Sequence, residues 1–199
     1  LPHNATRGGT IAACERSLKR LGTDHIELYL LHWRGRHPLA ETVDAFETLK
    51  RSGAIGAWGV SNFDVDDLEE LLSVPGGQAC ATNQVLYNLT ARGIEYDLLG
   101  WSADHGTPIM AYSPLGNDNR MLRHPTLNRI ADARGVTAAQ VALAFVLARP
   151  GVIAIPKATG LAHVADNRAA AELKLTAQEH AALDTAFPPP RRKQALEMI

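Results

Sequence analysis

The sequence predicts an α/β fold of parallel strands connected by helices, and three observations carry this prediction. The segment Ile26–Trp33 (IELYLLHW) crowds apolar residues into a near-continuous run, which is typical of a strand buried on both faces of a parallel sheet. Four further strand-like segments follow it, and stretches with helical periodicity separate them. Each of the five segments carries polar residues at or near its end, where α/β barrels keep their catalytic groups.

Helices and strands are expected to alternate along the chain. Each expected helix shows apolar residues three to four positions apart, and the expected helices cover 9–21, 39–49, 64–72, 96–105, 126–134, 137–148, 161–171 and 176–187. The strands are shorter apolar runs without that period, and they cover 26–32, 54–60, 80–85, 107–112 and 152–156. Because helices separate the strands, we expect parallel βα units with right-handed crossovers.

Local residues mark the ends of several elements. Glycines stand where three helices should stop, at Gly22, Gly53 and Gly106. Asp64 can cap the helix after the second strand, and Thr176 with Glu179 forms a capping box before the last helix. Pro188–Pro190 ends that helix, so residues 188–199 are expected to form a tail. The longest irregular stretch is the loop Ser113–His124, which has no apolar period.

Composition predicts one globular domain over residues 1–199. The chain is 46% hydrophobic with a formal net charge of -1, which gives no attraction to nucleic acid or to anionic membranes. No run of eighteen apolar residues is present, so no transmembrane helix is expected, and Leu1–Asn4 lacks the features of a signal peptide. Cys14 and Cys80 have no paired spacing, which favours two reduced thiols in a cytoplasmic protein.

A helix-turn-helix DNA-binding protein is the rival from another functional class. Residues 127–151 show the rhythm of two helices joined by a short turn. Against it, the basic residues of this region are only Arg129, Arg134 and Arg149, and the second helix is apolar on most faces. Hydrolase and metal sites are not expected, because the chain has no G-x-S-x-G, no H-E-x-x-H and no histidines at ligand spacing.

Four segments resemble the aldo-keto reductase family in its bacterial, NADPH-dependent form. They are RSLKRLGTDHIELYLLHW, GAWGVSNF, AYSPLG, and IPKAT followed by Asp166 and Asn167. The resemblance implies a (β/α)8 TIM barrel that binds a nicotinamide dinucleotide without a Rossmann domain, and no G-x-G-x-x-G follows any expected strand. It implies hydride transfer from NADPH to a small aldehyde or ketone, with NADH as the alternative cofactor.

His32 is the expected catalytic residue. It matches the active-site histidine of the family, whose ring donates a hydrogen bond to the substrate carbonyl oxygen. The alternative is a core histidine bonded to a backbone carbonyl. The neighbouring Trp33 is expected to line the substrate pocket, with simple packing as its alternative role.

The resemblance assigns the nicotinamide end of the cofactor to four residues. Ser61, Asn62 and Gln84 match the group that hydrogen-bonds the carboxamide, whose donors and acceptor suit amide and hydroxyl side chains. For Ser61 and Asn62 the alternative is a cap and turn before the next helix. Tyr112 matches the aromatic residue that stacks on the nicotinamide ring.

The phosphates are assigned to the last two strand ends. Ser113 and Leu115 lie in the loop that would fold over the pyrophosphate. Lys157 and Thr159 precede a helix expected to start near Leu161, and a helix N-terminus beside a lysine is a ready anion site. In the family this position receives the adenosine 2′-phosphate, which implies NADPH.

The adenine end departs partly from the family pattern. His163 stands where many relatives have arginine, and a neutral imidazole cannot form the bidentate fork that favours a phosphate. Asn167, with Asp166, matches the pair that contacts adenine. The histidine at position 163 weakens the case for strong NADPH selectivity.

The proton donor of the family is not found in this sequence. The resemblance places a tyrosine, a lysine and an aspartate on the first three strands of the barrel, and the match here starts after them. Tyr29 lies inside a strand and is no substitute. The chain is therefore expected to be the C-terminal portion of a reductase, about five βα units, and the alternative is a non-catalytic remnant that binds nucleotide or a partner. The complete protein is expected to be a monomer.

Produced alone, residues 1–199 are expected to associate or stay partly molten, because five strands of an eight-stranded barrel leave two unpaired edges. They should also lack NADPH-dependent carbonyl reduction, because no group protonates the alkoxide. Measurement of size in solution and an assay with a reactive aldehyde test both expectations. A cooperatively unfolding monomer with normal turnover would contradict them.

Overall fold

The computed structural model describes residues 1–118 and 120–199, and Asn119 of the expected loop 113–124 lies outside the described residues. The chain divides into two compact units, Leu1–Gln84 and Val85–Ile199. The single domain expected over residues 1–199 stays a prediction, and each unit is described by itself.

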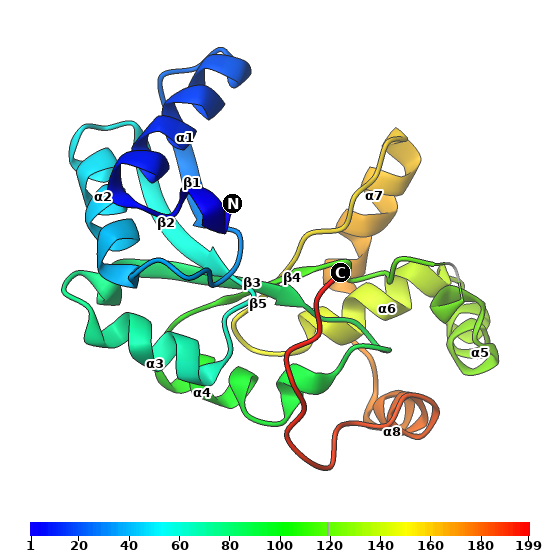
Figure 1. Cartoon of the computed structure of the whole chain (residues 1–199). Coiled ribbons are helices and arrows are strands. Elements are labelled where there is room, and N and C mark those ends of the chain that lie inside the picture. Colours follow the sequence, from blue (N-terminus) through cyan, green and yellow to red (C-terminus); the bar gives the residue numbers. More distant parts are fainter. Residues whose placement is uncertain (119) are drawn as a thin grey trace. The chain divides into compact units, whose positions relative to one another are not determined.

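The first unit alternates helices with parallel strands (Figure 1). Its elements are α1 (Arg7–Leu21), β1 (Ile26–Leu31), α2 (Leu39–Arg51), β2 (Ile55–Ser61), α3 (Val65–Ser73) and β3 (Cys80–Leu86), whose last two residues belong to the second unit. β1 pairs with β2 in parallel, and β2 pairs with β3 in parallel with Ser61 opposite Gln84. The predicted order of helix and strand is thus confirmed for this unit.

The core of the first unit lies between α2 and β2. The helix buries every fourth or third residue, as its apolar period predicts, at Leu39, Val43, Phe46 and Leu49. The ring of Phe46 stacks on that of the fully buried Trp58, with 5.2 Å between centroids. The indole nitrogen of Trp58 donates a hydrogen bond of 2.7 Å to Glu47, so this buried polar group is satisfied.

Burial of β1 on both faces is a wrong prediction. Only Leu31 of this strand is buried, whereas Ile26, Leu28, Tyr29 and Leu30 are half-buried. Within the described residues β1 pairs with β2 alone, so one edge and part of one face keep contact with solvent. An apolar run by itself does not distinguish a central strand from such an edge strand.

Apart from Asn119, the residues of the second unit form five helices and two strands after β3, besides short 3-10 turns. They are α4 (Leu98–Asp104), β4 (Ile109–Tyr112), α5 (Pro125–Arg134), α6 (Ala138–Leu147), β5 (Val152–Ala154), α7 (Leu161–Ala169) and α8 (Ala177–Ala186). β4 and β5 are parallel, with Met110 opposite Ile153. α4 starts two residues later than expected, because the chain before it forms a separate 3-10 turn, Gly93–Glu95.

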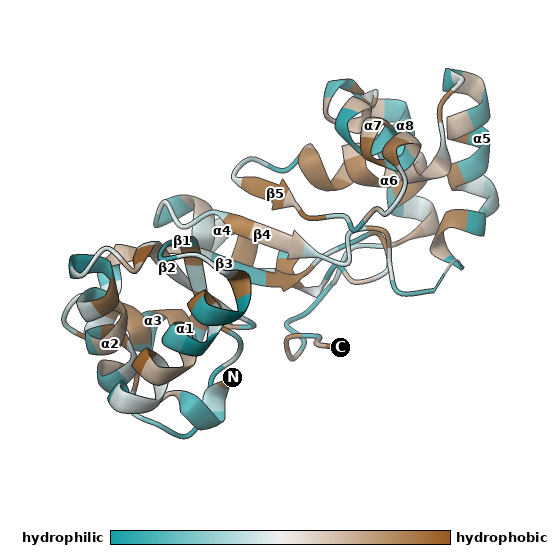
Figure 2. Ribbon diagram, turned by 90° about the horizontal axis from the view of Figure 1, so that it is seen from above, coloured by the Kyte–Doolittle hydropathy of each residue, from teal (hydrophilic) through white to brown (hydrophobic). Residues whose placement is uncertain are grey.

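The helix α6 forms the core of the second unit. Six consecutive residues, 141–146, are buried, and Figure 2 shows this helix as mostly apolar. The axes of α5 and α6 meet at an angle of 96°. No single described helix is long and apolar enough to cross a membrane; α5 and α6 taken together reach that length and composition, but only as a bent pair. A DNA-recognition helix needs an exposed polar face, so the burial of α6 favours a core helix over the helix-turn-helix alternative.

A buried ionic cluster connects the chain after β3 to the segment that follows α6 and to the end of α8. Arg92, only 4% exposed, donates to both carboxylate oxygens of Glu95 at 2.9 and 2.7 Å and to the carbonyl of Phe187. Arg149 donates to the same carboxylate and to the hydroxyl of Tyr87, each at 3.2 Å. Tyr87 in turn donates to Glu95 at 2.7 Å, and burial raises the pKa of its phenol. The partners leave the buried charges compensated.

The pair Arg134–Glu179 joins α5 to α8, and we predict that its contribution to stability depends on pH. Arg134 donates two hydrogen bonds of 2.7 Å to Glu179, which also completes the capping box with Thr176. The guanidinium lowers the pKa of Glu179 to about 2. Because a depressed carboxyl pKa stabilises the folded state above the unfolded pKa of about 4.3, the contribution should be complete at pH 7 and lost between about pH 5 and pH 2.

In the whole protein, Glu179→Gln should therefore lower the urea midpoint at pH 7, and its difference from the unchanged protein should shrink as the pH falls through that window. Glu172→Gln is the control, since its pair with Arg168 is exposed (71% and 74%) and surface pairs contribute little. An effect of Glu179→Gln that is constant from pH 7 to pH 2 would contradict this origin of the stability.

Candidate active site

Four predicted site residues lie at the carboxyl ends of the strands of the first unit. His32 directly follows β1, Ser61 is the last residue of β2, and Asn62 follows it. Gln84, on β3, stands opposite Ser61 in the parallel register. Parallel pairing therefore places side chains from three separate stretches of sequence at one edge.

Hydrogen bonds join these four residues. The side-chain amide of Asn62 donates to the carbonyl of His32 and to the hydroxyl of Ser61, both at 3.1 Å. The Ser61 hydroxyl donates to the carbonyl of Gln84 at 2.8 Å, and the Asn62 backbone N–H donates to the same carbonyl at 2.9 Å. Asn62 has a φ of 57°, a left-handed conformation that asparagine tolerates better than most residues.

Of the structural alternative for Ser61 and Asn62, the turn is present at Asn62, whereas the cap of α3 does not involve either residue. The residue that caps α3 is Asp64, whose side chain accepts from the N–H of Val65. The carboxylate of Asp67 accepts from the N–H of Asp64 at 3.0 Å and completes the capping box. The helix end is satisfied without Ser61 or Asn62, so their side chains are not required for the cap.

His32 is exposed, which is contrary to a buried core histidine. Its ring meets that of Trp33 edge to face, with 4.7 Å between centroids, and Trp33 is 38% exposed. The next residue, Arg34, donates to both carboxylate oxygens of Glu70 on α3 and to the carbonyl of His37. This bidentate contact fixes the loop that carries Trp33, and no sequence motif singles out Arg34.

In the second unit, Tyr112 and Ser113 lie at the carboxyl end of β4. Tyr112 is the last residue of the strand and is half-buried, and burial raises the pKa of its phenol, so the ring is neutral near pH 7. The backbone of Ile199, at the end of the tail, hydrogen-bonds to this phenol. Ser113 has a φ of 46°, and Leu115 is half-buried in the loop that follows.

The remaining predicted residues gather at the start of α7. Lys157 and Thr159 are exposed in the segment between β5 and α7, and His163 is exposed in the first turn of the helix. Asn167 is half-buried one turn later, and so is Asp166. The N-cap residue Gly160 has no side chain to accept from the first N–H groups of α7, which leaves this helix end suited to an anion.

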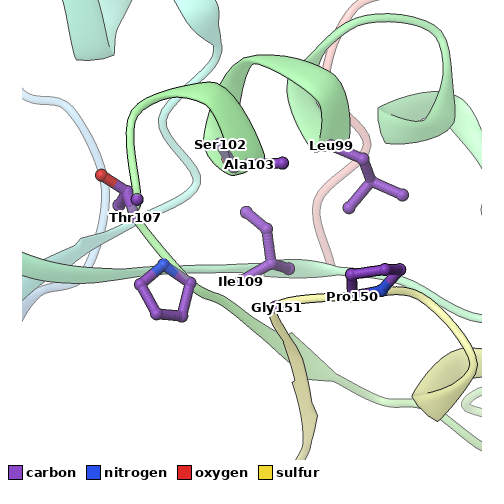
Figure 3. Close-up of a pocket in the computed structure, with 9 residues that line it drawn as sticks. Leu99, Ser102, Ala103, Thr107, Ile109, Pro150 and Gly151 are labelled. Atoms are coloured by element: carbon purple, nitrogen blue, oxygen red, sulfur yellow. The ribbon is translucent and has the colours of Figure 1, made fainter.

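The second unit also contains an apolar pocket of about 250 Å³ that the sequence did not indicate. In Figure 3, the side chains of Leu99, Ile109 and Pro150 converge on it. Ile109 begins β4, so the pocket lies at the end of this strand opposite Tyr112. None of the predicted site residues is among those that line it, and it is not part of the candidate active site.

Known proteins similar to this chain agree with the predicted class. Residues 2–187 match the aldo/keto reductase family. Methylglyoxal reductase YeaE of Escherichia coli (strain K12) is 51% identical over 202 aligned positions, which cover 100% of this chain and 71% of that protein. Glyoxal reductase of Bacillus subtilis (strain 168) is 34% identical, over 88% of this chain and 62% of its own length. A crystal structure of an aldo-keto reductase from Klebsiella pneumoniae in complex with NADPH has a TM-score of 0.96 and 49% identity, covering 100% of this chain and 71% of that one.

The chain belongs to the aldo/keto reductase family. It spans between about three fifths and seven tenths of the length of these relatives. The predictions of an α/β fold that forms part of a (β/α)8 barrel, and of an oxidoreductase of the aldo/keto reductase class, are confirmed. The roles of the individual site residues stay predictions.

Asn62 offers a test of the geometry of this edge. Asn62→Ala should lower the free energy of unfolding by about 2 kcal/mol, because it removes hydrogen bonds and places alanine in the left-handed region. Asn62→Gly removes the same bonds but accepts the backbone conformation, so it should cost about 1 kcal/mol. Urea unfolding of the whole protein, followed by tryptophan fluorescence, measures both. Equal losses would mean that the left-handed conformation has no cost.

Proposed function

We propose that the whole protein reduces small aldehydes or ketones to alcohols with NADPH, and that His32 is a catalytic residue. The observation that carries the proposal is the hydrogen-bonded group His32–Asn62–Ser61–Gln84 at the ends of three parallel strands, in a chain of the aldo/keto reductase family. The bound nicotinamide supplies the hydride. The chain's own residues orient the reactants.

His32 would hold the substrate. Its exposed imidazole has a donor nitrogen for the carbonyl oxygen of an aldehyde or ketone, on which negative charge develops during reduction. The hydrogen bond from Asn62 to the backbone carbonyl of His32 fixes the main chain below that ring. Trp33, in edge contact with His32, would close one side of the substrate pocket and exclude water.

Each unit, taken by itself, contains strand-end residues that suit one part of a nicotinamide. Ser61, Asn62 and Gln84 present hydroxyl and amide groups that match a carboxamide, which has donors and an acceptor of its own. Tyr112 presents a neutral aromatic ring for stacking.

The phosphate end fits the start of α7. Lys157 and Thr159 lie beside a helix N-terminus whose N–H groups lack a side-chain cap, so the 2′-phosphate and its charge are accommodated there. Ser113 and Leu115 would lie along the pyrophosphate. Asn167 would contact the adenine, and the exposed His163 would approach the phosphate without a bidentate contact, which keeps NADH as the alternative cofactor.

No proton donor is assigned among the tyrosines that the structure describes. Tyr29 packs edge-on against Phe46 at 6.1 Å, Tyr87 is held in the buried ionic cluster, and Tyr96 is exposed. The alternative of a chain that binds nucleotide without catalysis is separated from the proposal by an assay of the whole protein with NADPH and an aldehyde.

A small dicarbonyl compound is the substrate class that we favour. Two of the relatives are named methylglyoxal reductase and glyoxal reductase, after a three-carbon and a two-carbon dicarbonyl compound. We further propose a monomer located in the cytoplasm, with no nucleic acid or membrane partner; the free cysteines Cys14 and Cys80 and the formal net charge of -1 agree with this.

His32→Ala in the whole protein should lower turnover of methylglyoxal at least tenfold while the dissociation constant for NADPH changes little, because the ring contacts the substrate and not the cofactor. His25→Ala is the matched control, since His25 precedes β1 at the opposite end of the strand. Steady-state kinetics and a fluorescence titration give the two values. Normal turnover in His32→Ala would assign His32 a structural role.

Lys157→Ala should raise the dissociation constant for NADPH about tenfold or more and leave that for NADH nearly unchanged, because only NADPH carries the 2′-phosphate. The control is Lys174→Ala, which removes another exposed lysine of the second unit. Equal effects of Lys157→Ala on both dinucleotides would place the phosphate elsewhere.

A further inference from the structure

A buried asparagine, Asn88, hydrogen-bonds to the backbone next to Tyr112. Asn88 is 3% exposed, and its side-chain amide donates to the carbonyl of Ser113 at 3.0 Å. Its side-chain oxygen accepts from the N–H of Thr90 at 2.9 Å, from the hydroxyl of Thr90 at 2.8 Å and from the N–H of Ala91 at 2.9 Å. The oxygen thus holds the side chain to its own loop, while the amide reaches 25 residues along the chain.

The backbone that Asn88 holds is in an unfavourable conformation. Ser113 has a φ of 46°, a region that residues other than glycine and asparagine rarely adopt. Such a conformation persists where the surroundings over-determine it. Here the carbonyl of Ser113 accepts from Asn88 and from the N–H of Gly116 at 2.9 Å.

The same short stretch also holds the preceding carbonyl. The N–H of Tyr87 donates to the carbonyl of Tyr112 at 3.4 Å. Two consecutive residues, Tyr87 and Asn88, therefore hold the carbonyls of two consecutive residues, Tyr112 and Ser113. Tyr87 thus holds the peptide plane between Tyr112 and Ser113, and Asn88 holds the next plane, between Ser113 and Pro114. Together the two bonds restrain the backbone on the carboxyl side of Tyr112, and with it the direction in which the Tyr112 side chain leaves the backbone.

We propose that Asn88 is a positioning residue that sets the orientation of the Tyr112 ring for the nicotinamide of the cofactor. This inference rests on the proposed function, in which Tyr112 stacks on that ring. The long-range amide bond to Ser113 is the part of the contact set that acts on the site. The three bonds to the Asn88 oxygen close a local turn and serve to hold the asparagine itself.

The test compares two ligands that differ only in the nicotinamide. Asn88→Asp keeps the acceptor for Thr90 and Ala91 but removes the donor to Ser113 and places a carboxylate oxygen against its carbonyl. In the whole protein it should raise the dissociation constant for NADPH about tenfold and that for 2′-phospho-ADP-ribose, which lacks nicotinamide, by less than about twofold. Thr90→Ala, which leaves the bond to Ser113 intact, is the control and should change neither value appreciably.

Two further variants make the result decisive. Asn88→Ala removes the donor without adding charge. It should give the same selective loss of NADPH binding, and it replaces Asn88→Asp in the test if that variant does not fold. Ser113→Gly relieves the backbone penalty, so adding Asn88→Asp to it should weaken NADPH binding less than in the unchanged background.

The outcomes separate this inference from the proposed function. Equal weakening of both ligands would mean a general structural role for Asn88 and would overturn the inference, as would unchanged NADPH binding in both Asn88 variants. Failure of the unchanged protein to bind either ligand would overturn the proposed function, and the inference with it.

Discussion

Parallel pairing of β1, β2 and β3 is the constraint on which the first part of the candidate site depends. Parallel strands all end at the same edge, so His32, Ser61 and Gln84 meet there although some 50 residues separate the first from the last. Because Ser61 stands opposite Gln84, its hydroxyl donates a hydrogen bond to the carbonyl of Gln84 on the neighbouring strand. The side-chain amide of Asn62 donates to the carbonyl of His32, next to β1. Side chains gathered in this way need no special loop to bring them together.

Two left-handed residues, Asn62 and Ser113, each follow the end of a strand directly. At this point a chain that continued as a strand would carry its next side chains away from the edge. A positive φ instead turns the backbone at once, which keeps the strand-end residue at the rim and directs the following segment across it. Each of the two residues also takes part in hydrogen bonds that stabilise the turn.

Features set by local pattern could be predicted from the sequence, and features set by distant partners could not. The apolar period of α2 predicts the residues that it buries, and the pattern Thr176-x-x-Glu179 predicts the capping box of α8. The partial exposure of β1 depends on which strands lie beside it, and the apolar run does not record this. Asn88 and Arg34 act through contacts 25 and 36 positions away, and nothing in their immediate sequence marks them. Most of the site residues follow from strand ends and family motifs, whereas the groups that hold them in place appear only in three dimensions.

The buried cluster around Arg92 has a consequence for how the second unit responds to dissolved salt. Its contacts to Glu95 are screened little by dissolved ions, because the two side chains are only 4% and 10% exposed. Pairs on the surface, such as Arg168–Glu172, stand in solvent and fade as counterions accumulate around them. Rising ionic strength therefore removes the outer attractions first and leaves the inner cluster intact. Within the second unit, the contact between Arg92 and Glu95 should therefore depend less on ionic strength than the exposed pairs do.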